Sequence, residues 1–131
     1  MRFVLEASVA LAWFLPDEQS EALDYARRVF VHVDRELAFA VVPLVWHEEV
    51  AGTLVKRLRA GRYYGAMPLE THVNSYTVGI LLERAKRYGL QAIDAIYCDL
   101  AVALGLTLAT NDQRLRNAAA AHGVKLFEPD T

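Results

Sequence analysis

Cysteine and long apolar runs are both scarce in this chain, and each absence excludes particular classes of protein. Cys98 is the only cysteine, which excludes an intramolecular disulfide framework and a cysteine-based zinc site and fits a reducing compartment. No apolar run approaches the roughly 18 residues that a membrane helix needs, and Glu6 interrupts the apolar start too early for the core of a signal peptide. We therefore expect a soluble cytoplasmic domain that does not enter a membrane.

An excess of basic charge is also lacking. The chain has 14 Lys and Arg residues against 16 Asp and Glu residues, a formal net charge of −2, so any contact with a nucleic acid must be local. No glycine-rich phosphate loop is present, which argues against a nucleotide cofactor. Apolar material is abundant instead: hydrophobic residues make up 54% of the 131 residues, and we expect one domain over residues 1–131.

Strand and helix patterns alternate along the chain. Short β-branched runs predict strands, whereas apolar residues at a spacing of three or four predict helices. The expected strands cover 2–5, 37–42 (closed by Pro43), 106–110 and 124–127, and the expected helices cover 9–14, 18–34, 45–59, 77–88, 93–104 and 113–122. Segment 63–75 is the least legible, and one interpretation gives it a helix start at Pro68 and a short strand near Val73. The alternation predicts an α/β fold in which a parallel sheet is sandwiched between helices.

Carboxylates fall where such a fold binds ligands, at the carboxyl ends of the strands. Glu6 follows the first expected strand, and Asp112 follows the strand at 106–110. Asp94 and the pair Glu48–Glu49 lie on helices that can converge on the same edge. Four carboxylates in one cleft repel each other unless a divalent cation compensates, and hard oxygen ligands of this kind suit Mg²⁺ or Mn²⁺. The chemistry indicated is metal-dependent hydrolysis of a phosphodiester.

Four short stretches occur in an order that is fairly specific, although each alone is weak. They are 3–10 (FVLEASVA), 43–51 with its ending WHEEVA, 92–97 (AIDAIY) and 108–115 (LATNDQRL). With these stretches the sequence resembles the PIN-domain family, and most closely the VapC-like ribonuclease toxins of type II toxin–antitoxin pairs. The resemblance runs from one end of the chain to the other and implies a PIN-like fold.

The resemblance implies an Mg²⁺- or Mn²⁺-dependent endoribonuclease that acts on an RNA substrate. It implies that the catalytic acids are Glu6, Glu49, Asp94 and Asp112, and that the metal ligands are Glu6, Asp94 and Asp112. Within the pair of glutamates the family pattern selects Glu49 and leaves Glu48 as the fallback. The resemblance also implies a small antitoxin as the protein partner and a homodimer as the usual state.

One residue departs from the family pattern. The family usually has Asp where this chain has Glu6, and the extra methylene moves the carboxylate outward, whereas Mg²⁺ demands near-octahedral geometry. The alternative function is therefore a catalytically impaired PIN-like module that binds RNA or protein.

Three residues are candidates for supporting the metal site without binding the ion. Ser8 is favoured as the N-cap of the helix that follows it, although its hydroxyl can also orient Glu6. Thr110 can bond a metal-bound water or its own backbone, and the sequence does not decide between them. Asp99 lies five residues after Asp94 and projects away from it, so it is expected as a supporting or surface charge.

Basic and apolar residues flank the acidic centre. Lys56, Arg59 and Arg62 on one side and Arg114 on the other are expected to hold the RNA backbone. The run 13–15 (WFL) is unusually apolar for the periphery of a small domain, and we expect it to contact the partner protein.

Overall fold

The computed structural model describes residues 1–14, 21–57 and 69–129, apart from the side chains of Lys56 and Arg57. The strands in these ranges are β1 (Arg2–Leu5), β2 (Phe39–Pro43), β3 (Leu69–His72) and β4 (Thr107–Ala109). The helices are α1 (Ala7–Phe14), α2 (Glu21–Asp34), α3 (Leu44–Arg57), α4 (Val78–Tyr88), α5 (Ala92–Leu104) and α6 (Gln113–Ala121). Among the described residues, no helix has the length and apolar character needed to cross a membrane.

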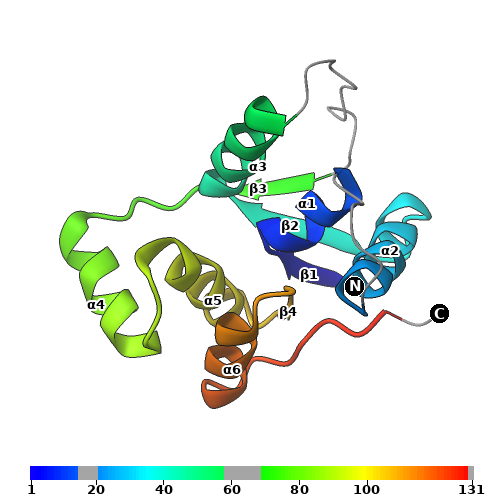
Figure 1. Cartoon of the computed structure of the whole chain (residues 1–131). Helices are drawn as coiled ribbons and strands as arrows, with labels where there is room; N and C mark the ends of the chain where they lie inside the picture. The colour runs from blue at the N-terminus through cyan, green and yellow to red at the C-terminus, as the bar shows by residue number, and fades with distance from the viewer. Residues whose placement is uncertain (15–20, 58–68, 130–131) are drawn as a thin grey trace.

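The four strands form one parallel sheet in the order β3-β2-β1-β4 (Figure 1). Phe3 of β1 lies opposite Ala40 of β2 on one side and opposite Thr107 of β4 on the other. The α/β class and the parallel sheet predicted from the sequence are therefore confirmed. Because β1 and β4 are neighbours, the segments that follow their carboxyl ends lie at one edge of the sheet.

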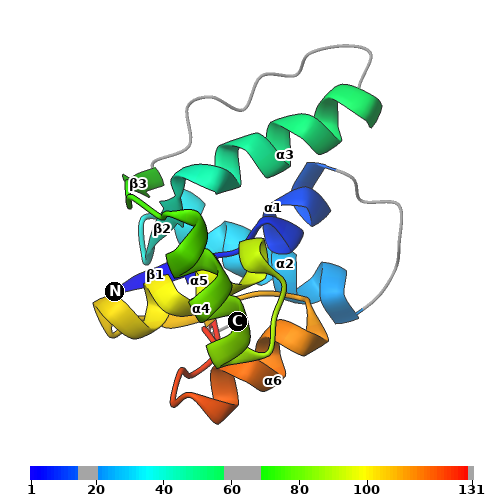
Figure 2. The ribbon, with the colours of Figure 1, turned by 90° about the vertical axis from the view of Figure 1, so that its left-hand side faces the viewer.

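Helices cover both faces of the sheet, which explains why its central strands are apolar along their length. α5 packs against one face with α4 outside it, and α2 lies on the other side (Figures 1 and 2). Phe3, Val4 and Leu5 of β1 are fully buried, as are Val41 and Val42 of β2. Each such side chain stabilises the fold by about 1.5–3 kcal/mol.

The C-terminal segment contradicts the strand predicted over 124–127. It meets β4 through a single parallel bridge between Leu108 and Leu126. The ladder does not continue because the Phe127 carbonyl oxygen accepts a hydrogen bond from the Tyr25 hydroxyl of α2 (2.6 Å), while the Phe127 ring is buried in the core. The segment therefore packs across the sheet and α2 without forming a fifth strand.

Other boundaries differ by a few residues. Pro43 is the last residue of β2 and pairs with His72 of β3, so it lies within the strand that it was expected to close. The strand expected near Val73 is β3, which ends one residue earlier. Pro68 and the helix expected to start there lie outside the described residues, as do the predicted helical positions 18–20 and 58–59.

The ends of α4 and α5 follow the sequence patterns closely. The Thr77 side chain caps α4 by accepting a hydrogen bond from the Ile80 N–H (3.2 Å). Gly89 and Gly105 end α4 and α5 with φ of 65°, a conformation that side-chain-bearing residues adopt at a cost. These ends fix where α5 begins and place Asp94 in its first turn.

Candidate active site

Glu6 follows β1 directly and is buried at the carboxyl edge of the sheet, with 6% of its surface exposed. Its Oε2 accepts hydrogen bonds from the Ser8 N–H (2.9 Å), the Ser8 hydroxyl and the Thr110 hydroxyl (3.0 Å). Because α1 begins at Ala7, Glu6 caps that helix, and the N-cap role predicted for Ser8 is wrong. The glutamate side chain turns back to accept from the free N–H of Ser8, and the Ser8 hydroxyl adds a second hydrogen bond from within the helix.

The same two hydroxyls tie the segment after β4 to Glu6. Ser8 Oγ accepts a hydrogen bond from the Asn111 N–H (3.0 Å), and Thr110 Oγ1 accepts one from the Asp112 N–H (3.0 Å). The Asp112 carboxylate then caps α6 by accepting a hydrogen bond from a backbone N–H of its first turn (3.1 Å). The ends of β1 and β4 are therefore fixed against each other, and Glu6 and Asp112 lie at the same edge.

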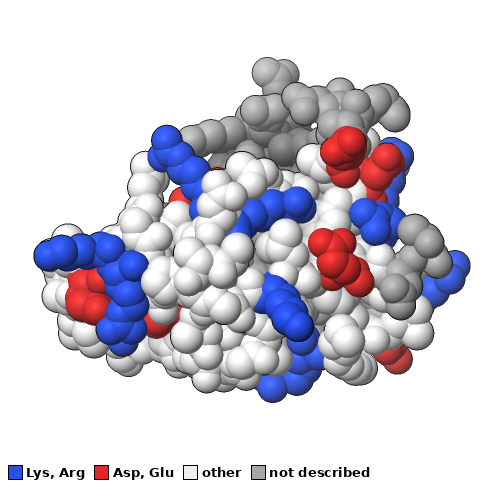
Figure 3. Space-filling model, turned by 90° about the horizontal axis from the view of Figure 1, so that it is seen from below, with Lys and Arg blue, Asp and Glu red and all other residues white. Residues whose placement is uncertain are grey.

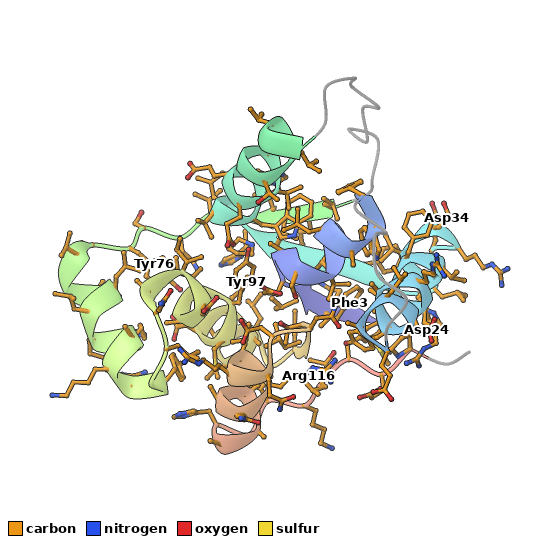
Figure 4. All side chains as sticks on the ribbon, viewed as in Figure 1. Phe3, Asp24, Asp34, Tyr76, Tyr97 and Arg116 are labelled. Atoms are coloured by element: carbon orange, nitrogen blue, oxygen red, sulfur yellow. The ribbon has the colours of Figure 1, made fainter. Side chains whose placement is uncertain are left out.

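Glu49 reaches the site from α3 and is held by a tyrosine of α5. The Tyr97 hydroxyl donates a hydrogen bond to Glu49 Oε1, and Tyr97 is fully buried in the middle of the molecule (Figure 4). Glu48 is exposed and lines another cavity, of about 190 Å³. Tyr97 was not singled out from the sequence. Its spacing could have indicated it, because a residue three positions after Asp94 lies on the same side of a helix.

Charge effects link the four acids in pairs: Glu49 acts on Glu6, Asp94 acts on Glu49, and Asp112 acts on Asp94. Burial raises the pKa of Glu6, hydrogen bonds from its supporting groups oppose this, and the negative charge of Glu49 adds to it. Burial likewise raises the pKa of Glu49, with a further contribution from Asp94. Burial and then the charge of Asp112 raise the pKa of Asp94. Negative charge is therefore concentrated at this edge of the sheet.

This donor set fits a divalent cation by its chemistry, since carboxylate oxygens are the ligands that Mg²⁺ and Mn²⁺ prefer. Within residues 1–14, 21–57 and 69–129, no group of three acidic, histidine or cysteine side chains is gathered closely enough to hold a metal ion. The chemistry of the oxygen donors therefore suits a cation, which would offset the mutual repulsion of the acids, whereas the spacing of the acids in the described structure is wider than that of a ligand set.

Asp99 lies in surroundings other than those expected. It accepts hydrogen bonds from the Tyr76 hydroxyl (2.8 Å), the Tyr88 hydroxyl (2.8 Å) and the Arg84 Nε (3.0 Å). All three donors belong to α4 or to the segment just before it, so Asp99 fastens α4 to α5. The expectation that it supports the metal site is corrected, because five residues turn a helix by about 140° away from Asp94.

The structure describes one of the four basic side chains expected to hold RNA. Arg114 is exposed in the first turn of α6, and its positive charge opposes the stronger effect of burial on the pKa of Asp94. Arg114 therefore lies near enough to Asp94 for its charge to act on that carboxyl. The Lys56 side chain, Arg59 and Arg62 lie outside the described residues.

The apolar run at the end of α1 is half-buried in its described part. The Trp13 Nε1 donates a hydrogen bond to the Ala26 carbonyl of α2 (2.6 Å), and the Trp13 ring meets Phe30 edge to face at 5.4 Å. Trp13 therefore joins α1 to α2, while it and Phe14 keep part of their surface exposed. Leu15 lies outside the described residues.

Comparisons with known proteins bear on the fold. No protein-family model matches the sequence, and no curated protein matches it. The chain is similar to the crystal structure of PAE2754 from Pyrobaculum aerophilum, with a TM-score of 0.59 and 20% sequence identity over 90% of this chain and 84% of that one. The similarity shows a shared fold, and a shared fold does not define a function.

Proposed function

We propose that the protein is an Mg²⁺- or Mn²⁺-dependent endoribonuclease of the PIN type. The observation that carries this proposal is the series of interacting carboxylates at the carboxyl edge of the sheet, formed by Glu6, Glu49, Asp94 and Asp112. Burial and mutual repulsion raise the proton affinity of the first three, and a bound divalent cation relieves that repulsion. The same four acids occupy the stretches that resemble the PIN-domain family.

Glu6, Asp94 and Asp112 are the residues that would hold the cation, with Glu49 beside them. When bound, the cation supplies activation of the attacking water and neutralisation of charge on the phosphate. The protein's own groups orient the acids before any substrate arrives. The described hydrogen bonds to Glu6 all fall on Oε2, so Oε1 is the oxygen available to a ligand.

RNA is held in this proposal by local phosphate contacts beside the acids. Figure 3 displays basic and acidic side chains interspersed on the face seen from below, in keeping with the net charge of −2. The charge of Arg114 acts on Asp94. Lys56 lies near the end of α3, and Arg59 and Arg62 follow that helix along the chain. Phosphate contacts of this kind position a strand without performing the chemistry. Single-stranded or loop RNA is the substrate class proposed.

The deciding experiment incubates the purified chain with a structured RNA and Mg²⁺ or Mn²⁺, with a parallel reaction in EDTA. We expect cleavage that EDTA abolishes and that Asp94→Asn and Asp112→Asn each reduce about 100-fold or more, the usual loss when a charge-stabilising group leaves an active site. Asparagine also caps helices well, so Asp112→Asn preserves α6. Asp34→Asn, an exposed acid at the end of α2, is the matched control. Cleavage that survives EDTA, or that persists undiminished in Asp112→Asn, contradicts the assignment.

A second candidate function is favoured by the surroundings of Glu6. Its Oε2 is already satisfied by three hydrogen bonds from the protein itself, and the residue is buried. A module that binds RNA through its basic residues and cleaves nothing is compatible with that arrangement. RNA binding without cleavage by the native chain, together with cleavage by Glu6→Asp, favours this second candidate.

The resemblance also supports a biological setting, which we include in the proposal. The enzyme acts in the cytoplasm as a homodimeric toxin, and a small antitoxin covers its acidic cleft and contacts the exposed parts of Trp13 and Phe14. Co-expression with the product of any short gene that adjoins the gene of this chain tests this. A stable complex that suppresses RNA cleavage is the expected result, and Trp13→Ala weakens the complex. A neighbouring product that neither binds nor inhibits contradicts it.

A further inference from the structure

A polar cavity of about 240 Å³ adjoins the segment that carries the acids. It lies where the start of α2, the start of α6 and the C-terminal segment meet. Its charged and amide lining consists of Glu21, Arg28, Asn111, Gln113, Arg116 and Glu128. None of these residues is one of the four acids of the site described above.

The cavity and the acidic site share the segment that follows β4. Asn111 lines the cavity, and its backbone N–H binds the Ser8 hydroxyl that supports Glu6. Arg116 donates a hydrogen bond from Nε to the Thr110 carbonyl oxygen (2.8 Å). A ligand in the cavity therefore lies beside the acids, and the backbone of the segment that follows β4 separates the two.

Two arginines are held in fixed positions at this cavity. The guanidinium carbons of Arg116 and Arg28 lie 5.0 Å and 5.8 Å from the centroid of the buried Tyr25 ring. Arg28 also donates a hydrogen bond to the Pro129 carbonyl oxygen (3.2 Å), and Figure 4 shows Arg116 where α6 meets the C-terminal segment. Neither arginine forms an ion pair with any described carboxylate. Each therefore presents oriented N–H donors beyond the one it has already used.

The lining combines donors with acceptors, and this decides the kind of ligand. Glu21 and Glu128 offer only acceptors, the arginines offer only donors, and the amides of Asn111 and Gln113 offer both. A phosphate group carries acceptors alone and is repelled by two carboxylates. A nucleobase presents donors and acceptors together on its edges, and unpaired bases stack well on guanidinium planes.

Among the bases, guanine matches this lining best. Its O6 and N7 accept a bidentate pair of hydrogen bonds from an arginine, and its adjacent N1–H and N2–H groups suit a carboxylate. We propose that the cavity binds an unpaired guanine of the RNA next to the bond that is cut. The identity of the polymer rests on the proposed function, whereas binding of the base can be measured without cleavage.

The test is a nuclear magnetic resonance titration of the ¹⁵N-labelled native chain in EDTA. The four nucleoside 5′-monophosphates and inorganic phosphate are the probes, and the side-chain amide signals of Asn111 and Gln113 are the readout. We expect the guanosine nucleotide to shift these signals, and the other three to require about tenfold higher concentrations, the discrimination that one good bidentate pair gives. Inorganic phosphate alone leaves the signals unchanged.

Variants of exposed side chains separate the contributions without threatening the fold. The double variant Glu21→Gln with Glu128→Gln is expected to weaken binding of the guanosine nucleotide about tenfold. Arg35→Gln, an exposed residue just beyond α2 that does not line this cavity, is the control and binds like the native chain. Arg116→Gln is less informative because Arg116 also holds the Thr110 carbonyl.

Each remaining outcome decides the matter. If inorganic phosphate shifts the signals as strongly as the guanosine nucleotide, or if removing the carboxylates tightens binding, the cavity is an anion site and the inference is overturned. Equal binding of all four nucleotides overturns the preference for guanine. Guanosine binding by a chain that cleaves no RNA supports this inference while the proposed function fails. RNA cleavage by a chain whose cavity binds no nucleotide rejects the inference alone.

Discussion

At the scale of single residues, Thr110 does the most to organise the site. Its hydroxyl donates to Glu6 and accepts from the Asp112 N–H, so one buried group sets the positions of two acids. Ser8 plays the parallel part with Glu6 and Asn111. The sequence favoured helix capping for Ser8, which is wrong, and left the role of Thr110 undecided, because the partners of both hydroxyls include a contact between segments about 100 residues apart.

We predict that Thr110→Val weakens both the fold and the metal site. Valine keeps the shape and removes the hydroxyl, which leaves the buried Glu6 carboxylate with one donor fewer, so the free energy of unfolding falls by about 1–3 kcal/mol. Mn²⁺ affinity falls about 10–100-fold, the usual effect of losing a group that orients a ligand. Urea denaturation and calorimetric titration measure the two effects. Thr110→Ser keeps the hydroxyl and serves as the control; an unchanged Mn²⁺ affinity in Thr110→Val counts against the supporting role.

We predict that Glu6→Asp binds Mn²⁺ more tightly than the native chain. The shorter side chain draws the carboxylate back toward the sheet without changing its charge, and Mg²⁺-type ions tolerate misplaced ligands poorly. A gain on the order of 1 kcal/mol, the scale of one well-placed polar contact, corresponds to about fivefold in affinity. Calorimetry with Mn²⁺ on both chains checks this. Tighter binding by the native chain contradicts it and indicates that Glu6 is already well placed.

At the scale of helices and strands, periodicity and capping residues predicted most of the fold. Residues close together in the sequence determine where a short apolar strand forms and where a helix ends at a glycine. These elements were therefore confirmed within a few residues. The strand predicted over 124–127 is wrong because the Phe127 carbonyl oxygen bonds to the Tyr25 hydroxyl, a partner about 100 positions away in the sequence. Glu6, Asp94 and Asp112 followed from their places at strand ends and helix starts, and Glu49 followed from the resemblance to the PIN-domain family. The roles of Tyr97 and Asp99 depend on which helices pack together, so the sequence did not reveal them.

A variant of Asp99 tests the packing of α4 on α5 without changing the acidic site. We predict that Asp99→Asn lowers the free energy of unfolding by about 2 kcal/mol, because hydrogen bonds to a charged acceptor are lost or weakened. RNA cleavage per folded molecule stays at the native level, since the described contacts of Asp99 are with Tyr76, Arg84 and Tyr88. Thermal denaturation and the cleavage assay are run side by side, with Asp34→Asn as the control. A loss of cleavage without a loss of stability restores Asp99 to the site.

At the scale of the whole molecule, the acidic edge works against the stability of the domain. The pKa values of Glu6, Glu49 and Asp94 are raised in the folded state, first by burial and then by neighbouring charge. Each group therefore binds its proton more tightly when folded than when unfolded. Ionising these acids is therefore costlier in the folded chain than in the unfolded one, and the proposed cation would offset that cost.

We predict that this cost makes stability depend on pH and on divalent cations. Between the ordinary pKa, 4.5 for Glu6 and Glu49 and 3.8 for Asp94, and the raised value, the folded state carries more protons than the unfolded state. The free energy of unfolding contributed by these groups therefore falls as pH rises through that window. In EDTA, we expect Asp94→Asn to be more stable than the native chain at neutral pH, and its free energy of unfolding to fall less steeply as pH rises.

The cation gives the second expected result. Mn²⁺ at about 100 times its Kd adds about 2.7 kcal/mol to the free energy of unfolding of the native chain and much less to that of Asp94→Asn. Urea denaturation from pH 3.8, the lowest ordinary value, up to neutral pH measures both effects, with Asp34→Asn following the native curve. An equal response of native and Asp94→Asn chains to Mn²⁺ shows that the cation binds elsewhere.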